Sequence, residues 1–588
     1  MSNLSAAQFE TWSPALKARY FGLTEESIPF RTLLVFSAIA VTFFLLIKSV
    51  YVQYPIVFSD EALYTLHSKF LNDPRFVASR PNILYFFVYH IASWFGSNHV
   101  FVEKFLNSAF FGLSLFPLYG TARQFLSKSG SYIFSLAIVS SPISSYSVYV
   151  MPESLYCFVF WILAYIVVIR LPNDIVYGGI YSGATLALLS AVKPHALILT
   201  MTVPLVLLSL FFLNSDNIPV RRLVRAGLVY LLTLVVGRLI INYAITGDLL
   251  VSPFGSYYGD LFGPQMQPRR PLVSPELWHT IRGHLSYLAV LFWPAIATAV
   301  RPSQLAGRDG RERAHYVALL SFSFAALALL ILLAAKYTVD VTAATVPKDA
   351  CRLIGRYYNV TLGTLVIVFL AGTKFANGNR ACSQAFRVVL VTGAIVSGAS
   401  AYFAFLDYCP NLVDFPEVVC FSMFRIGLAL VIAASLAAAL GLAFLTPSAG
   451  RAIYLTFLGT LSLTTSAAVF VGQVLFIKSP PQVDLAAIAV RNLVPDQIDD
   501  GIVLARMEDA RSYRAMFQLY SLSERKILAK PVLTADDIPA GRKWALLLDP
   551  YVVNVPVYST LRGKGFVFLQ LAPAATAADG ALKPAQAH

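Results

Sequence analysis

Long apolar runs separated by short polar loops make up most of the chain, from residue 31 to residue 477. A helix needs about 20 apolar residues to cross a hydrocarbon core of about 30 Å, and we count about thirteen runs near that length. This pattern predicts an all-α polytopic membrane protein. The predicted spans are 31–50, 100–120, 131–149, 153–169, 176–192, 196–213, 226–244, 284–300, 314–336, 357–373, 388–406, 420–445 and 452–477.

One long stretch near the N-terminus, residues 51–99, interrupts this pattern because two groups of polar residues divide it. Its later part is apolar and aromatic and contains Tyr85, Tyr89 and Trp94. This composition favours helices that lie in the membrane interface, and the alternative is a simple exposed loop.

The composition changes again after the last apolar run, where Pro480-Pro481 begins a mixed segment. Three β-rich runs alternate with a helical stretch near 512–523, which predicts a small α/β unit. We therefore expect an N-terminal segment, a membrane domain that includes the loop 51–99, an α/β domain and a disordered tail rich in Ala and Pro. Their predicted bounds are 1–30, 31–478, 479–571 and 572–588, and the β-rich runs are 501–505, 543–548 and 565–569.

Composition supports a membrane protein. The 588 residues are 57% hydrophobic and 13% charged, and the mean hydropathy of +0.66 excludes a soluble globular protein of this size. The net charge of +14 could suggest nucleic acid, but the basic residues lie in short loops between apolar runs, where they act as topology signals. No nucleic-acid partner is predicted.

The distribution of these basic residues predicts a cytoplasmic N-terminus in the plasma (inner) membrane. The first 30 residues show no cleavable signal pattern, so we expect no removal. With this orientation the unusual polar clusters and the whole C-terminal domain fall on the extracytoplasmic face. Those clusters lie at the Asp60 loop, 151–153, 193–195, 246–283, 337–356 and 407–419.

The five cysteines are too few for a disulfide framework. Cys409 and Cys420 flank one short polar loop and would be able to bridge if that loop faces an oxidising compartment. Cys157 is predicted to be a single thiol buried among aromatic residues.

An adjacent pair of carboxylates, Asp60 and Glu61, follows the first apolar run. Charged groups at the end of a span are costly unless water, a partner or a substrate engages them. Adjacent side chains point to different sides, so only one can face a given substrate atom, and an apolar surrounding would raise its pKa as a general base requires. The alternative is helix capping, because Ser59-Asp60-Glu61 also suits a helix N-terminus.

Two cations lie at predicted span ends on the same face, Lys193 in Lys193-Pro194-His195 and Arg356 in Arg356-Tyr357-Tyr358. A lysine and an arginine beside apolar segments form the kind of pair that holds a phosphate. Snorkelling to the interface explains either residue alone. Two cations on the carboxylate face favour a shared polar pocket.

Glu153 is a third acid at a span end, and behind Pro152 it also suits a helix N-terminus. His67, His90 and His99 lie near acids, but no spacing resembles a zinc motif. No metal site is predicted, no cofactor is firmly predicted, and assistance by a divalent cation is left open. The chain has no Walker loop, dinucleotide fingerprint or nucleophile elbow.

Four short motifs together resemble a known family, the integral-membrane glycosyltransferases of the GT-C fold. The nearest branch is the bacterial one that includes the aminoarabinose transferase of lipid A and relatives of protein O-mannosyltransferases. About thirteen spans and a small extracytoplasmic domain also fit that branch. The motifs are Ser59-Asp60-Glu61, Tyr149-Val150-Met151-Pro152-Glu153-Ser154-Leu155, Lys193-Pro194-His195 and Gly355-Arg356-Tyr357-Tyr358.

The resemblance implies an enzyme that transfers a hexosyl or pentosyl group from a polyprenyl-phosphate donor to a lipid, glycan or protein acceptor on the extracytoplasmic face. It implies that Asp60 is the general base of an inverting displacement and that Lys193 and Arg356 hold the donor phosphate. Glu61 is assigned to the catalytic pair as an acceptor-binding or bracing group. Further substrate-binding candidates are Glu153, His195, Tyr357 and Tyr85.

Two other functions remain open from the sequence. A secondary transporter also has many spans with charges, but its polar residues would gather near the midplane rather than on one face. A flippase or polymerase of lipid-linked glycans is chemically closer. Convergence of Asp60, Lys193 and Arg356 on one cavity favours the transferase, because a transporter needs a path that reaches both faces.

Overall fold

The computed structural model describes residues 27–50, 58–71, 81–213, 218–251, 274–299, 310–342, 352–375, 384–408, 410–422, 425–445, 447–476, 482–506, 510–520, 524–563 and 565–572. The predicted N-terminal segment and disordered tail lie almost wholly outside these residues. So do Cys409 and the side chain of Cys420, whereas Cys157 is free and buried as expected.

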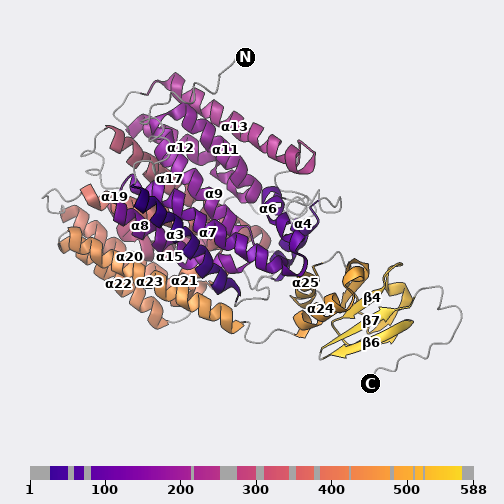
Figure 1. The fold of residues 1–588 in the computed structure, drawn as a ribbon. Helices are drawn as coiled ribbons and strands as arrows, with labels where there is room; N and C mark the ends of the chain where they lie inside the picture. The colour runs from indigo at the N-terminus through magenta and orange to yellow at the C-terminus, as the bar shows by residue number, and fades with distance from the viewer. Residues whose placement is uncertain are drawn as a thin grey trace, which may run out of the picture.

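A bundle of long helices occupies most of the described chain (Figure 1). A short helix, α4 (Phe58–Lys69), and a second, α6 (Ile83–Tyr89), follow the first long one. The other helices of the bundle are α3 (Ile28–Val50), α7 (His99–Arg123), α8 (Lys128–Val139), α9 (Glu153–Tyr165), α10 (Leu171–Asn173), α11 (Ile175–Val192), α12 (Thr202–Leu213), α13 (Val220–Thr246), α15 (Pro275–Ala299), α17 (Gly310–Tyr337), α19 (Leu362–Phe375), α20 (Gln384–Asp407), α21 (Pro416–Ser422), α22 (Arg425–Phe444) and α23 (Pro447–Phe476).

Each of the thirteen predicted spans corresponds to a helix of this bundle. Nine helical segments in the described part of the chain are long and apolar enough to cross a membrane. Of the other four, α7 and α15 each have 25 residues, and α7 buries polar side chains such as Glu103, Lys104 and Asn107. The remaining two helices are shorter: α8 has 12 residues and α19 has 14.

The predicted span 131–149 is the one that the structure changes most. Its helix, α8, ends at Val139, and a 3-10 turn (Pro142–Val148) continues the chain. Pro142 has no backbone N–H to continue the α-helical ladder, and Ser141 Oγ bonds back to the carbonyl of Ile138 at 2.7 Å. The segment 90–98 after α6 is likewise a 3-10 helix, and exposed Trp94 and Phe95 suit the interfacial role that we predicted.

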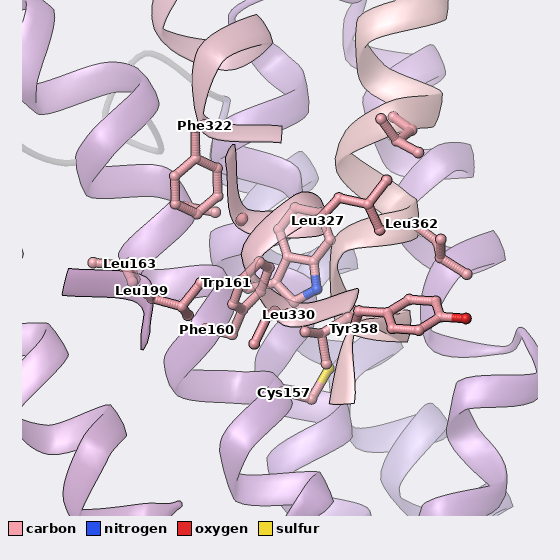
Figure 2. Close-up of a cluster of buried hydrophobic side chains, with 14 of the residues drawn as sticks. Cys157, Phe160, Trp161, Leu163, Leu199, Phe322, Leu327, Leu330, Tyr358 and Leu362 are labelled. Carbon is pink, nitrogen blue, oxygen red and sulfur yellow. The ribbon is translucent and has the colours of Figure 1, made fainter. Parts of the chain in front are cut away.

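Buried aromatic and aliphatic side chains fill the middle of the bundle. Figure 2 shows Trp161 of α9 together with Leu327 and Leu330 of α17 and Leu362 at the start of α19. A Cβ on Gly363 would lie 2.7 Å from the Trp161 ring, so only glycine allows α19 to pack this closely. Tyr358 belongs to the same core, which fixes the segment just before α19.

The C-terminal region, residues 482–572, forms a five-stranded sheet in the order β2-β1-β4-β7-β6. β1 runs parallel to β2 and β4, and β7 runs antiparallel to β4 and β6. The three predicted β-rich runs are β1, β4 and β7, and the predicted helix is α25. The elements are α24 (Gln482–Leu493), β1 (Gly501–Ala505), α25 (Ala510–Leu519), β2 (Glu524–Ile527), β3 (Val532–Thr534), β4 (Trp544–Leu547), β5 (Val552–Asn554), β6 (Val557–Gly563) and β7 (Phe566–Leu571).

The C-terminal region meets the bundle at α4, against which α25 packs (Figure 1). Leu66 of α4 is buried in the apolar cluster formed by α24, α25 and the sheet. We call this side of the molecule, where α4 meets α25, the α4 end of the bundle. The sheet strands lie beyond it.

Candidate active site at the α4 end of the bundle

The first turn of α4 separates the two adjacent carboxylates. Successive residues of a helix are about 100° apart, so the two side chains leave α4 in different directions. Asp60 Oδ2 lies 3.7 Å from Arg356 Nη2, and the Asp60 side chain is 33% exposed. Glu61 is buried, and its Oε1 accepts a hydrogen bond of 3.0 Å from the backbone N–H of Val150. Of the two carboxylates, Asp60 is the one that lies beside Arg356.

A 3-10 turn, Gly355–Tyr357, positions Arg356. A Cβ on Gly355 would lie 2.3 Å from the ring of Phe415, so a glycine is needed here. The N–H of Arg356 donates a hydrogen bond of 2.6 Å to the carbonyl of Asp414. The Arg356 guanidinium is thereby held with Nε 3.5 Å from Asp414 Oδ1, and its side chain is 9% exposed.

Asp414 is the centre of a second set of contacts that the sequence did not reveal. Its carboxylate is fully buried and forms an ion pair with Arg352. Asn411 Nδ2 donates to the same Oδ2 at 2.6 Å, and Asn411 Oδ1 accepts the N–H groups of Val413 and Asp414. These contacts fix the loop that orients Arg356.

Glu153 and Lys193 form a buried ion pair on the other side of the site. Lys193 Nζ lies 2.8 Å from Glu153 Oε1, and the two side chains are only 5% and 4% exposed. Glu153 is the first residue of α9, where a carboxylate stabilises the helix dipole. Lys193 Nζ also lies 4.8 Å from the centre of the Tyr357 ring, so this aromatic face contributes to holding the ammonium group.

Aromatic rings pack around Tyr357, beside Lys193. The His195 ring lies 4.6 Å from the Tyr357 ring, and Tyr337, which the sequence did not suggest, lies 5.6 Å from Tyr357. Tyr85 is placed differently from this group. It is fully buried in α6 and stacks on Tyr89 at 4.1 Å.

The charges of the site are balanced, because it has three cations and three carboxylates. The cations are Lys193, Arg352 and Arg356, and the carboxylates are Asp60, Glu153 and Asp414. Withdrawal from bulk water raises the pKa of Asp60 above its ordinary value of 3.8; Arg356 lowers it, and the charges of Glu153 and Asp414 raise it. Arg356 Nη1 and Glu153 Oε2 are buried and have no hydrogen-bond partner among the described residues. A desolvated guanidinium N–H without an acceptor favours an anionic ligand at this point.

A largely apolar cavity of about 680 Å³ lies between α8, α15, α19 and α23. Asn359, three residues after Arg356, and Glu417 belong to its lining near the site, and Arg451 belongs to its lining near the start of α23. Burial raises the pKa of Glu417 to about 7, with hydrogen bonds to its own backbone and to Asn359 opposing the rise. The cavity therefore has polar residues at Asn359 and Glu417 beside a largely apolar lining within the bundle, and Asp60, Lys193 and Arg356 do not line it.

The three histidines considered for zinc each contact another group, and the His67 ring lies 5.2 Å from the Phe86 ring. Nδ1 of His90 lies 2.8 Å from the carbonyl oxygen of Ser68, and Nδ1 of His99 lies 3.2 Å from that of Gly96. Within the described ranges, His, Cys, Asp and Glu side chains nowhere form a group of three or more suited to a metal ion.

Solved structures resemble this chain although no family model and no curated protein matches it. ArnT from Cupriavidus metallidurans in the apo state matches at 13% identity and a TM-score of 0.46, over 92% of this chain and 98% of that chain. ArnT bound to undecaprenyl phosphate matches at 13% and 0.46, over 93% and 99%. The Archaeoglobus fulgidus oligosaccharyltransferase in the apo form matches at 12% and 0.42, over 87% and 69%.

Both of these proteins are glycosyltransferases of the GT-C fold, which is the family that the four sequence motifs resemble. With identities of 12–13% and TM-scores below 0.5, the likeness carries no argument about residues or reaction. The function proposed below therefore rests on the contacts of this chain itself.

Proposed function

We propose that the protein transfers a glycosyl group from a polyprenyl-phosphate sugar to a lipid, glycan or protein acceptor on the extracytoplasmic face of the plasma membrane. One observation carries the proposal. A partly exposed carboxylate with a raised pKa lies 3.7 Å from an arginine that has an unpaired buried N–H, at one end of a bundle of apolar helices.

Asp60 is the general base of the proposed reaction. It takes the proton of the acceptor hydroxyl while the acceptor oxygen forms a bond to the anomeric carbon and the bond from that carbon to the phosphate oxygen breaks. The electron pair of the broken bond stays on the phosphate. A single displacement from the face opposite the phosphate inverts the anomeric configuration, and no strong acid is needed because cations stabilise the leaving group.

Arg356 is the principal phosphate ligand in this proposal. Its Nη1 has no partner among the described residues, and its contact with Asp60 is long at 3.7 Å. Binding of a phosphate would draw the guanidinium towards the donor and weaken its hold on Asp60, which favours proton uptake by the carboxylate. Lys193 directs one N–H bond to Glu153 and has two others, so it is the second phosphate ligand in this proposal.

The remaining candidates take supporting roles. Glu61 braces α4 through its bond to the Val150 N–H. Glu153 orients Lys193, and Tyr357 with His195 forms the wall beside that ammonium group. In this proposal the largely apolar cavity, whose lining includes Asn359, takes the polyprenyl chain. No role at the sugar follows from the buried position of Tyr85.

A transfer assay tests the proposal. Purified protein in lipid is given radiolabelled polyprenyl-phosphate sugars and a membrane extract as acceptor. Asp60→Asn should lower transfer by about 10²- to 10⁴-fold, because the amide keeps the shape of the side chain but cannot accept the proton. Donor binding should persist.

Asp407→Asn is the matched control, since Asp407 is also paired with an arginine, Arg282, but is 40% exposed. It should transfer label at the wild-type rate. Full activity of Asp60→Asn would refute the assignment of the base. Absence of transfer from every donor, together with saturable uptake of a free solute into vesicles, would instead indicate a transporter.

A further inference from the structure

One side of α4 carries Asp60 and the other side belongs to the C-terminal region. Phe517 of α25 packs with Ala62 of α4 and with Val150, the residue whose N–H holds Glu61. One turn further along α4, Leu66 is buried in the core of the C-terminal region. The helix that presents the carboxylate is therefore packed into both parts of the molecule.

Tyr520, directly after α25, closes this contact. Its ring stacks on His99 of α7, with ring centres 3.5 Å apart and an angle of 4° between the planes. Lys69, the last residue of α4, donates a hydrogen bond of 2.5 Å to the Tyr520 carbonyl and lies 4.5 Å from the centre of its ring. Tyr520 thus joins α25, the end of α4 and the start of α7 at one point.

The backbone of Tyr520 is unusual as well. Its φ of 50° makes it the one non-glycine residue with positive φ in the described part of the chain. A residue with a side chain adopts this region at a cost, and such a conformation persists where surrounding contacts determine it. The stacked ring and the lysine provide these contacts.

We propose that Tyr520 is a positioning residue, through which the C-terminal region holds α4 at the angle that places Asp60 opposite Arg356. The inference rests on the proposed function for its catalytic consequence. Its structural content stands on the contacts of Tyr520, Lys69 and His99. The C-terminal region is, in this account, a part of the transferase machinery rather than a separate binding module.

Two variants of Tyr520 in the full-length protein test the proposal. Tyr520→Gly removes the ring and accommodates the positive φ, whereas Tyr520→Phe retains the ring. We expect Tyr520→Gly to accelerate hydrogen exchange of the α4 amides and to lower kcat by about 10- to 100-fold, because small misplacements of a reacting group are costly. The KM for the donor should change little, since Arg356 and Lys193 lie outside this contact. Tyr520→Phe should show wild-type hydrogen exchange of α4 and a wild-type kcat.

Lys69→Met provides a second route if Tyr520→Gly does not fold. It removes the ammonium group from the Tyr520 ring and carbonyl and should produce a smaller change in the same direction. Faster α4 exchange with an unchanged kcat, or no change in either quantity, would overturn the proposal. If the wild type shows no transferase activity, the proposed function fails. Unaltered hydrogen exchange of α4 in both Tyr520→Gly and Lys69→Met would then separately overturn the positioning role of Tyr520.

Discussion

Two polar clusters flank α4, and they differ in how far their carboxylates are exposed. On one side, Asp60 faces Arg356 across 3.7 Å and is partly exposed. On the other, Glu61 lies in a fully buried cluster with Glu103 and Lys104 of α7. There, Thr65 Oγ1 donates to Glu103 Oε2 at 3.3 Å, and Lys104 Nζ donates to the Ser49 carbonyl at 3.2 Å.

The difference distinguishes a reactive arrangement from a structural one. In the cluster of Glu61, hydrogen bonds of 3.0–3.3 Å connect α4 to Val150 and to α7, and α7 to the end of α3. Such a network stabilises the packing but exposes no group to a ligand. In the cluster of Asp60, a partly exposed carboxylate and a guanidinium N–H without a partner among the described residues are held by neighbours that are themselves fixed. In the proposed mechanism, the adjacent acids Asp60 and Glu61 therefore have separate tasks.

Among variants that keep Asp60, removal of Arg356 should produce the largest change in activity. Arg356→Gln should lower kcat/KM by about 10- to 100-fold, since a charge-assisted hydrogen bond to the donor phosphate contributes about 1.5–3 kcal/mol. Titration with polyprenyl phosphate should show a weaker affinity. Arg352→Gln is the control, because Arg352 is 31% exposed and acts through Asp414. A larger loss of affinity in the control would remove Arg356 from the phosphate site.

Substitution on the Glu61 side should affect stability first. Glu61→Leu leaves the buried N–H of Val150 without its acceptor, and we expect the free energy of unfolding to fall by about 1–3 kcal/mol. Thermal unfolding in detergent measures this loss. Glu61→Gln keeps an acceptor oxygen and should lose less. If Glu61→Leu unfolds like the wild type but has no activity, Glu61 acts in the chemistry and the comparison fails.

The pH dependence should give the smallest and most specific effect. Because the pKa of Asp60 is raised, protonation should abolish transfer below an acidic limb that lies above pH 3.8, and activity should rise with pH through that limb. Arg356 lowers this pKa, so Arg356→Gln should move the limb to higher pH. A limb that moves to lower pH in this variant would contradict the assignment of Asp60.

The same raised pKa has a consequence for stability. The folded protein binds the Asp60 proton more tightly than the unfolded chain, so the ionised carboxylate opposes folding at neutral pH. Asp60→Asn should therefore unfold at the wild-type temperature or slightly above it. A clear decrease would mean that Asp60 is needed for the fold, and loss of transfer in that variant would no longer identify a base.

Periodicity predicted the helices well because apolar runs of span length leave few alternatives. The exception in 131–149 arose where Ser141 and Pro142 end α8, since hydropathy does not register a missing N–H. Of the strands of the C-terminal region, β1, β4 and β7 were predicted, but β2, β3, β5 and β6 were not. β6 is exposed along almost its whole length and so shows no buried apolar face, and β3 and β5 have only three residues each. Segments of that length carry too little pattern.

The sequence predicted those residues of the site that lie at the ends of predicted spans. Asp60, Glu153, Lys193 and Arg356 stand at ends of apolar runs, where any charge is conspicuous. Asp414 lies inside a polar loop and contacts residues about 60 positions away. The sequence predicted only that this loop, 407–419, lies on the same face as the other polar clusters. The sequence also could not tell that Glu153 and Lys193 are partners, or that Tyr85 is turned into the core.

Transfer of the acceptor proton to Asp60 keeps the total charge of the proposed site constant through the reaction. The donor is a phosphodiester with one negative charge, and the leaving polyprenyl phosphate has two. Asp60 becomes neutral in the same step, because it receives the acceptor proton. No ion has to enter or leave the site during this step, so no further charge has to be compensated there. Release of the proton and of the lipid phosphate can then follow as separate events.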